Sequence, residues 1–261
     1  MFFEYKNNKK KILKVNKEIG FIAHIEKHVF ILGLQGELRI QNLKSKKILK
    51  SIFIEPEIRL NRTNDGKTDS ERNLWFGTMD NLERKIEKGS LYKLDKNLKL
   101  IKVDKNYRIT NGPAFIDEYN LYHTDSRKKT IYKIKINKKN KIISKNIFKK
   151  LSPEEGVPDG MTLDKYKNLW VAHFRGACVS VFNSKAKLIH RIQFPAKNIT
   201  NCAFGGKNNQ ELYVSTATKG MNKADLRKFR YSGFFFSVKT NSKGILQKKF
   251  ILSNEEKRSL L

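Results

Sequence analysis

The stretch Asn168-Leu-Trp-Val-Ala172 is one of five short strand-like segments that recur along this chain of 261 residues. Each segment carries a central aromatic residue, and these aromatics are Phe30, Trp75, Tyr122, Trp170 and Tyr213. Successive aromatics are separated by 45, 47, 48 and 43 residues. A repeat of about 45 residues that contains several short strands is typical of the blades of a β-propeller.

Further strand-like segments follow within each repeat. A second segment, such as residues 130–136 or 233–238, alternates apolar and polar positions, as half-buried strands do. A third and more polar segment comes next, such as residues 141–148 or 245–250. Helical patterns are nearly absent, and the one candidate, residues 222–229, is expected to be a loop.

The repeats can be counted along the chain. Five lie between about Glu18 and Phe250, and residues 2–6 and 11–15 resemble the last two strands of a further repeat. The first two strands of that repeat are missing. We therefore predict an all-β fold, a six-bladed β-propeller whose first blade is incomplete at the N-terminus, as a single domain over residues 1–261. The missing inner strands are expected to leave an open seam with exposed strand edges.

Composition narrows the class of protein. Hydrophobic residues make up 39% of the chain, which is enough to build a core and excludes full disorder. The net charge of +30 comes mostly from lysines in short runs between apolar segments, where turns and strand ends belong. Arginine is the more usual reader of bases and phosphates, so we interpret the charge as a solvated surface and expect no nucleic-acid partner.

The chain shows no signal for export or membrane insertion. It contains no apolar run of the length of a membrane span and no secretory signal at its start. Its two cysteines, Cys178 and Cys202, are too few for a disulfide framework or a zinc knuckle. We therefore expect a cytoplasmic protein that is a monomer or a weak dimer.

One register of the repeat carries polar residues. The residue eleven positions before the central aromatic is Asn64, Asn111 or Asp159 in three repeats, and Asn201 fits if one residue is inserted. Equivalent positions on successive blades face the same axis, so these side chains should converge. Carboxylate and amide oxygens together bind divalent cations. A simpler interpretation is that each Asn-Gly or Asp-Gly forms a turn before a strand, but a turn alone does not explain the shared register.

Other chemical motifs are weak or absent. His24 and His28 are four residues apart, but on a strand they would lie too far apart for one metal ion, and no glutamate stands at the metalloprotease position. His123 and His173 do not share a register. The sequence contains no serine nucleophile elbow and no nucleotide-binding glycine loop.

Four ordered motifs at blade spacing resemble the SMP-30/gluconolactonase/LRE-like family, which includes regucalcin and bacterial sugar lactonases. The motifs are Asn61-Arg-Thr-Asn-Asp-Gly66, Asn111-Gly-Pro-Ala-Phe115, Val157-Pro-Asp-Gly-Met161 and Cys202-Ala-Phe-Gly-Gly206, each followed by its aromatic strand. The resemblance implies a six-bladed propeller with one divalent cation in its channel. It implies calcium first, with zinc or manganese as alternatives, and a small-molecule sugar lactone as the substrate.

The resemblance also assigns roles to individual residues. Asn111 and Asp159 match the metal ligands of the family, and Arg62 and Asn64 match its substrate-contacting residues. By this comparison Asp159 is both a ligand and the general base toward water, while Arg62 stabilises the oxyanion. The remaining ligand of the family, a glutamate on an earlier strand, has no counterpart here. The stretch 80–84 is shorter than the glutamate-containing loop of the family, so no role is carried onto it.

Several alternatives stay open at this point. The absent glutamate fits either a reading frame truncated at its start or a degenerate, inactive member, and the retained site residues favour truncation. A non-catalytic propeller that serves as a binding platform is the alternative from another class. A phosphotriesterase-like hydrolase with a similar cation in its channel is a second enzymatic alternative.

Overall fold

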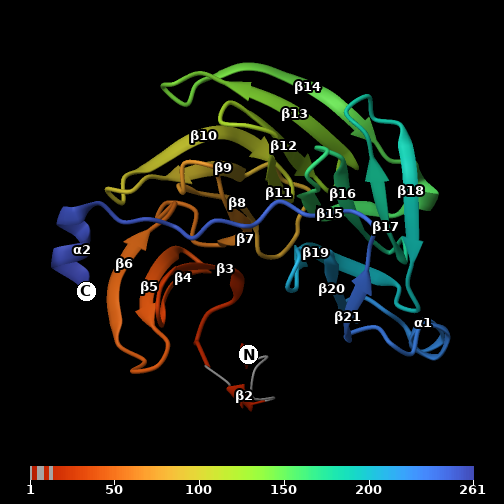
Figure 1. Ribbon diagram of the computed structural model, residues 1–261, viewed down its shortest axis with the longest axis horizontal. Coiled ribbons are helices and arrows are strands. Elements are labelled where there is room, and N and C mark those ends of the chain that lie inside the picture. The colour runs from red at the N-terminus through yellow and green to blue at the C-terminus, as the bar shows by residue number, and fades with distance from the viewer. Residues whose placement is uncertain (1, 5–8, 12–13) are drawn as a thin grey trace.

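The computed structural model describes residues 2–4, 9–11 and 14–261, and its strands form blades around a central channel (Figure 1). Blades I to IV each contain four antiparallel strands and blade V contains three. Blade I comprises β3 (Ile19–Glu26), β4 (Val29–Leu34), β5 (Glu37–Asn42) and β6 (Ile48–Phe53), and blade II comprises β7 (Asn61–Thr68), β8 (Leu74–Asp80), β9 (Gly89–Leu94) and β10 (Leu100–Tyr107).

The other three blades follow in chain order around the channel. Blade III comprises β11 (Thr110–Phe115), β12 (Asn120–Asp125), β13 (Thr130–Ile136) and β14 (Ile142–Lys150), and the short 3-10 helix η1 (Pro153–Glu155) follows it. Blade IV comprises β15 (Val157–Leu163), β16 (Leu169–Phe174), β17 (Cys178–Phe182) and β18 (Leu188–Gln193), and blade V comprises β19 (Asn198–Gly205), β20 (Glu211–Ala217) and β21 (Phe235–Lys239).

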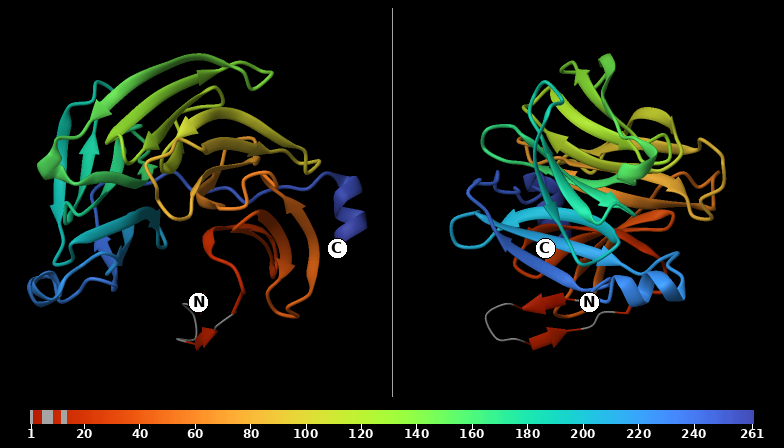
Figure 2. Two further views of the ribbon diagram at one scale, coloured as in Figure 1. Left: turned by 180° about the vertical axis from the view of Figure 1, so that it is seen from behind. Right: turned by 90° about the vertical axis from the view of Figure 1, so that its right-hand side faces the viewer.

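The predicted β-propeller is confirmed, but the prediction of six blades is wrong, because the structure has five. The first residues form only a two-stranded sheet of β1 (Phe2–Glu4) and β2 (Lys9–Lys11). Figure 2 shows this hairpin apart from the five blades. Two strands do not make a blade, because the strands that line the channel are not among them. The rest of the two predicted strands is residues 5–6 and 12–13, which lie outside the described residues, and residues 14–15, which are not in a strand.

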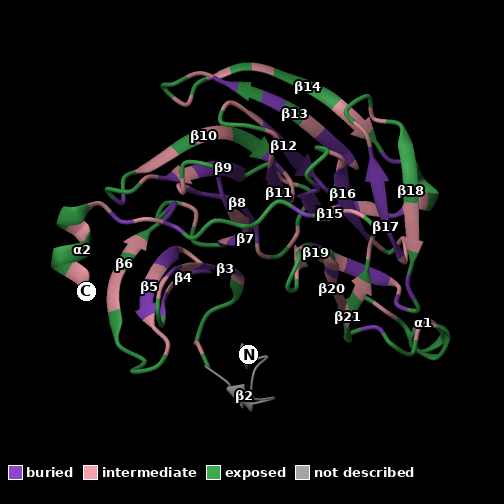
Figure 3. Ribbon diagram, viewed as in Figure 1, coloured by how far each residue is buried: buried purple, intermediate pink, exposed green. Residues whose placement is uncertain are grey.

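The core lies between neighbouring blades. Four buried apolar clusters join blades I and II, II and III, III and IV, and IV and V. Figure 3 shows burial concentrated on the second and third strands of the blades, such as β8 and β17, while outer strands such as β14 and β18 are largely exposed. The central aromatics Trp75, Tyr122 and Trp170 are each at most 3% exposed. In blades II, III and IV the repeat period therefore follows the aromatic that the blade buries, whereas Phe30 and Tyr213 of blades I and V are only partly buried.

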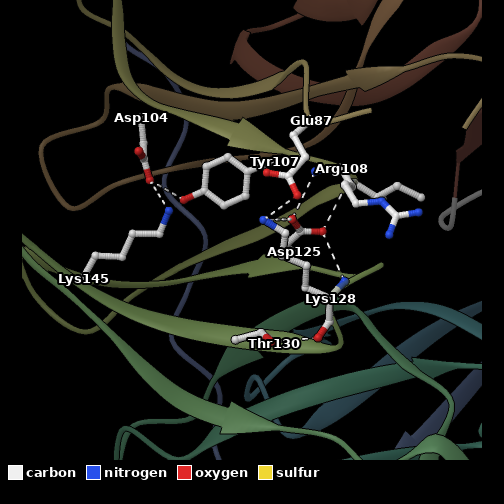
Figure 4. A network of polar contacts seen from close by, with 9 residues as sticks. Glu87, Asp104, Tyr107, Arg108, Asp125, Lys128, Thr130 and Lys145 are labelled. Atoms are coloured by element: carbon white, nitrogen blue, oxygen red, sulfur yellow. Dashed lines mark hydrogen bonds and ion pairs between the residues drawn. The ribbon is translucent and has the colours of Figure 1, made fainter. Parts of the chain in front are cut away.

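Polar contacts tie blade II to blade III at their outer strands (Figure 4). Lys145 Nζ on β14 lies 2.7 Å from Asp104 Oδ2 on β10, and the hydroxyl of Tyr107 donates to the same oxygen at 2.5 Å. Lys128 Nζ lies 2.8 Å from a carboxylate oxygen of Glu87. These contacts fix the two blades that carry most of the candidate site.

Blades V and I have no blade between them, and among the described residues no buried apolar cluster joins them. A cavity of about 610 Å³ opens between their facing sheets. Each sheet presents a stacked ring pair there, His24 with Phe30 at 4.6 Å and Tyr213 with Phe235 at 5.7 Å between ring centroids. The structure thus contains the seam that the missing strands imply.

Two local predictions at the end of the chain are wrong. Residues 222–229 contain a helix, α1 (Lys223–Lys228), which begins where the Asn222 side chain accepts a hydrogen bond from the Asp225 backbone at 2.8 Å. Residues 245–250 are not a strand of blade V but part of a strap that crosses the channel. Phe250 is the reason, because it is fully buried in the cluster between blades I and II.

The strap crosses the end of the channel at which the inner strands finish. Its backbone bonds to Leu163 at the end of β15 and to His24 near the end of β3. The helix α2 (Asn254–Leu260) follows it. None of the helices in the described part of the chain has the length and apolar character of a membrane span. The opposite end, at which the inner strands begin, is called the site mouth below.

Candidate functional site

The predicted polar register falls on an irregularity in each inner strand. The pairing of β7 with β8 shifts between Thr63 and Gly66. The same kind of shift follows Asn111 on β11, and on β15 it includes Asp159. Bulges of this kind re-aim side chains out of the sheet. The Asn-Gly and Asp-Gly pairs therefore lie within strands, and they do not form turns before them.

Two glycines are required at these bulges. Gly112 has a φ of +83°, a region that other residues rarely adopt. Its backbone N–H donates to Asp65 Oδ2 at 3.1 Å. At Gly160, a Cβ atom would lie 2.2 Å from the side chain of Asn201, so only glycine lets β15 and β19 approach this closely. Local backbone geometry thus explains why glycine follows Asn111 and Asp159.

The structure brings Arg62, Asn64, Asn111 and Asp159 together. All four line one cavity of about 470 Å³ at the site mouth. They come from the first halves of β7, β11 and β15, the inner strands of three consecutive blades. Asn201 on β19 lines the same cavity. The convergence expected from the register is therefore present in the structure.

A chain of hydrogen bonds orients the amides of the cavity. Arg62 Nη1 donates to Asn64 Oδ1 at 2.8 Å, and Asn64 Nδ2 donates to Asn111 Oδ1 at 2.9 Å. Asn111 Nδ2 donates to Ser126 Oγ at 2.7 Å, and Ser126 donates to the carbonyl of Pro158 at 2.6 Å. The chain links blades II, III and IV, so each amide oxygen has a fixed direction before any ligand binds.

Two carboxyl groups lie close together inside this frame. Burial raises the pKa of Asp65, although Lys67 and the N–H groups of Gly112 and Gly66 oppose the rise. Burial, and then the charge of Asp65, hold the pKa of Asp159 well above its usual value, while Arg62 favours its charged form. Two buried carboxyls that repel each other retain a proton to higher pH. A bound cation would remove this repulsion.

The oxygen donors suit a hard divalent cation. Asp159 offers a carboxylate and Asn111 an amide oxygen, and such ligands are typical of calcium sites. In residues 2–4, 9–11 and 14–261 there is no group of three His, Cys, Asp or Glu placed to hold a metal ion. A cation here would keep several water ligands. Calcium affinity decreases when fewer ligands are charged, so this donor set, with one carboxylate and one amide, predicts weak binding.

Sequence reasoning missed several charged residues of the cavity. Glu83, Arg127, Arg175 and Lys219 all line it. Glu83 lies 2.8 Å from Arg127 Nη2 and also pairs with Lys219 Nζ, so one carboxylate joins loops of blades II, III and V. Burial alone would raise the pKa of Glu83, but Lys219 and Arg127 lower it. These residues lie in loops after the second strand of each blade, and the polar pattern of the inner strands does not extend to those loops.

The fold and this cavity define a β-propeller with a polar, oxygen-lined site at one mouth of its channel. A family model described as the SMP-30/Gluconolactonase/LRE-like region matches residues 2–218. The chain belongs to that family.

Known relatives agree with this membership. An uncharacterised protein of Sulfolobus acidocaldarius is 37% identical over 188 residues, which cover 71% of this chain and 65% of that protein. A sugar lactone lactonase of Bacillus subtilis, YvrE, which is so named provisionally, is 29% identical over 88% of this chain and 82% of its own. A solved luciferin-regenerating enzyme superposes with a TM-score of 0.87 and 29% identity, over 96% of this chain and 87% of that one.

Proposed function

We propose that the protein hydrolyses sugar lactones with the help of one divalent cation. The observation that carries the proposal is the convergence of Arg62, Asn64, Asn111 and Asp159 on one cavity of about 470 Å³. This volume lies within the usual range for small-molecule sites. Family membership and the name of the Bacillus subtilis relative support the same reaction class.

In this proposal four residues of the cavity carry the reaction. Asp159 and Asn111 hold the cation, with calcium favoured over zinc because every donor is oxygen, and with manganese as the other cation that oxygen donors suit. When bound, the cation supplies Lewis-acid polarisation of a carbonyl oxygen. Arg62 donates toward the developing oxyanion, for which its fixed guanidinium is already oriented by Asn64. Asn64 orients a substrate hydroxyl.

Asp159 also accepts the proton of the attacking water. Burial raises the pKa of the cation-free Asp159 carboxyl, and a bound cation would lower it again, so the carboxylate is charged and able to accept a proton when the site is loaded. The water oxygen forms a bond to the lactone carbonyl carbon, and its proton passes to the carboxylate of Asp159. Collapse of the tetrahedral intermediate then breaks the ring ester bond, the leaving ring oxygen takes the proton from Asp159, and the open sugar acid is released with Asp159 again a carboxylate.

The test is hydrolysis of D-glucono-1,5-lactone, followed as acid release in a weakly buffered indicator assay. Spontaneous hydrolysis is subtracted, and the protein is treated with chelator before calcium, zinc or manganese is added. We expect activity that chelator removes and a cation restores, and a loss of at least 100-fold in Asp159→Asn. The control is Asp117→Asn, which changes an exposed carboxylate in the turn between β11 and β12.

The outcome also separates the alternatives. Equal rates with and without chelator in the unmodified protein would refute the metal-dependent mechanism. Hydrolysis of an organophosphate in place of lactones would assign a phosphotriesterase-like activity. Absence of any turnover, together with binding of a macromolecular partner, would favour a non-catalytic platform.

A further inference from the structure

At the rim of the cavity, the same loop of four blades contributes one charged side chain each. The loops between the second and third strands of blades II to V all lie at the site mouth, and each places one charged side chain on the cavity. In chain order these residues are Glu83, Arg127, Arg175 and Lys219. Three of the four are cationic, and they come from three consecutive blades. The rim therefore presents positive charge around an opening whose floor is polar.

A lysine-rich surface does not account for this rim. The chain contains 43 lysines and 12 arginines, so a random basic patch would be mostly lysine. The cavity instead takes three arginines, Arg62, Arg127 and Arg175, and one lysine, Lys219. The planar guanidinium group binds carboxylate and phosphate with two parallel hydrogen bonds, which lysine cannot do. The choice of residue type points to recognition of an anion.

Three of these cations already have protein partners. Arg62 donates to Asn64 Oδ1, while Arg127 and Lys219 share Glu83. Arg175 differs from them. Its side chain is exposed and lies over the Phe174 ring, with 6.0 Å between the guanidinium carbon and the ring centroid. In the part of the chain that the structure describes, its guanidinium group has no hydrogen bond or ion pair, so its donors are available to a ligand.

We propose that Arg175, supported by Arg127 and Lys219, selects lactones that carry an acidic group on the carbon farthest from the ring carbonyl. The acidic group is a carboxylate or a phosphate, because both match the guanidinium fork. Its charge points toward the rim while the lactone carbonyl lies at Asn111 and Asp159. This inference rests on the proposed lactonase function, because it deepens the substrate class of the same site.

The first test compares three lactones on the full chain in the presence of calcium. They are D-glucono-1,5-lactone, its 6-phosphate and D-glucaro-1,4-lactone, which carries a carboxylate. We expect kcat/KM to be at least tenfold higher for one acidic lactone than for the neutral one, and the advantage to shrink as salt rises from 50 to 500 mM. The two acidic substrates tell phosphate from carboxylate recognition. A ratio of one or less for both would overturn the inference.

Arg175→Gln shows whether this side chain is the cause. We expect the ratio of kcat/KM for the preferred acidic lactone to that for the neutral one to fall about tenfold. Arg258→Gln is the matched control, because Arg258 is an exposed arginine on α2, away from the site mouth, and should leave the ratio unchanged. An unchanged ratio in Arg175→Gln would assign the selectivity elsewhere and contradict the proposal.

A binding measurement separates this inference from the proposed function. If no lactone is hydrolysed, the lactonase proposal fails, and calorimetry with gluconate, 6-phosphogluconate and glucarate then decides the role of the rim. Binding of 6-phosphogluconate or glucarate at least tenfold tighter than gluconate, lost in Arg175→Gln, would support an acid-recognising rim. Equal binding of all three acids would overturn it.

Discussion

His123 gives this propeller a predictable sensitivity to acid. The ring lies on β12, fully buried against the edge of Tyr107 at 4.9 Å between ring centroids. Neither ring nitrogen has a hydrogen-bond partner among the described residues. Burial lowers the pKa of His123 from 6.5 to about 3, and Lys145 adds to the effect against the opposing charge of Asp104. The ring is therefore neutral in the folded protein at all ordinary pH values.

The magnitude follows from the two pKa values. In the unfolded chain His123 binds a proton below pH 6.5, whereas the folded protein resists protonation down to about pH 3. Between these limits the unfolded state binds more protons, so stability is complete above pH 6.5 and falls as pH falls. At pH 5 this single group lowers the free energy of unfolding by about 2 kcal/mol relative to pH 8.

His123→Leu removes the titrating ring and keeps an apolar group of similar size. We expect the free energy of unfolding to rise by about 1 to 2 kcal/mol at pH 8, because two desolvated nitrogens are lost. We also expect the difference in the free energy of unfolding between pH 8 and pH 5 to shrink by about 2 kcal/mol. Urea unfolding at both pH values, followed by tryptophan fluorescence, measures both. His190→Gln, at an exposed position of β18, is the control.

An unaltered pH dependence in His123→Leu would refute the reasoning. It would mean that the buried ring is protonated in the folded protein or that other groups dominate acid unfolding. A loss of stability at pH 8 would contradict the claim that the ring nitrogens lack partners.

Three further predictions concern the strap, the bulges and the cation. Phe250→Ala should lower the free energy of unfolding by about 3 to 5 kcal/mol in urea titrations, because the Phe250 ring is fully buried between blades I and II. A change under 1 kcal/mol would show that the strap does not pack against these blades. Gly160→Ala should lower the free energy of unfolding by about 1 to 3 kcal/mol in the same assay, because the new Cβ meets the side chain of Asn201. Gly36→Ala is the control: its new Cβ has no neighbouring atom within 4 Å, so this variant measures only the cost of placing alanine at a positive φ. The apparent affinity for calcium, followed by calorimetry, should rise with pH, since a proton competes for Asp159, whose pKa is raised; constant affinity from pH 5 to 8 would contradict that role.

Much of the fold could be predicted because its signal is local. Blades II, III and IV bury the aromatics Trp75, Tyr122 and Trp170 at an equivalent position, and burial maintains the repeat there. The number of blades and the path of residues 245–250 could not be predicted in the same way. A polar strand and a strap have similar compositions, and only the burial of Phe250 between blades I and II distinguishes them.

The residues of the candidate site likewise fall into a group that the sequence locates and a group that only the fold brings to the cavity. Asn64, Asn111 and Asp159 lie at equivalent positions of three inner strands, so a fixed offset from the aromatic finds them. The rim residues Glu83, Arg127, Arg175 and Lys219 follow the aromatics of their blades by 8, 5, 5 and 6 residues, so one offset finds only two of them. Asp65 belongs to the motif Asn61-Arg-Thr-Asn-Asp-Gly66, but its role is not visible in the sequence, because only the fold places it beside Asp159.

Calcium-dependent hydrolysis of D-glucono-1,5-lactone, measured side by side for the unmodified chain and Asp159→Asn, tests the central claim most directly. We predict that calcium restores hydrolysis to the chelator-treated unmodified chain and leaves Asp159→Asn at least 100-fold slower, while both proteins unfold at similar urea concentrations. Equal calcium-dependent rates in the two proteins would contradict the assignment of Asp159, and with it the proposed mechanism.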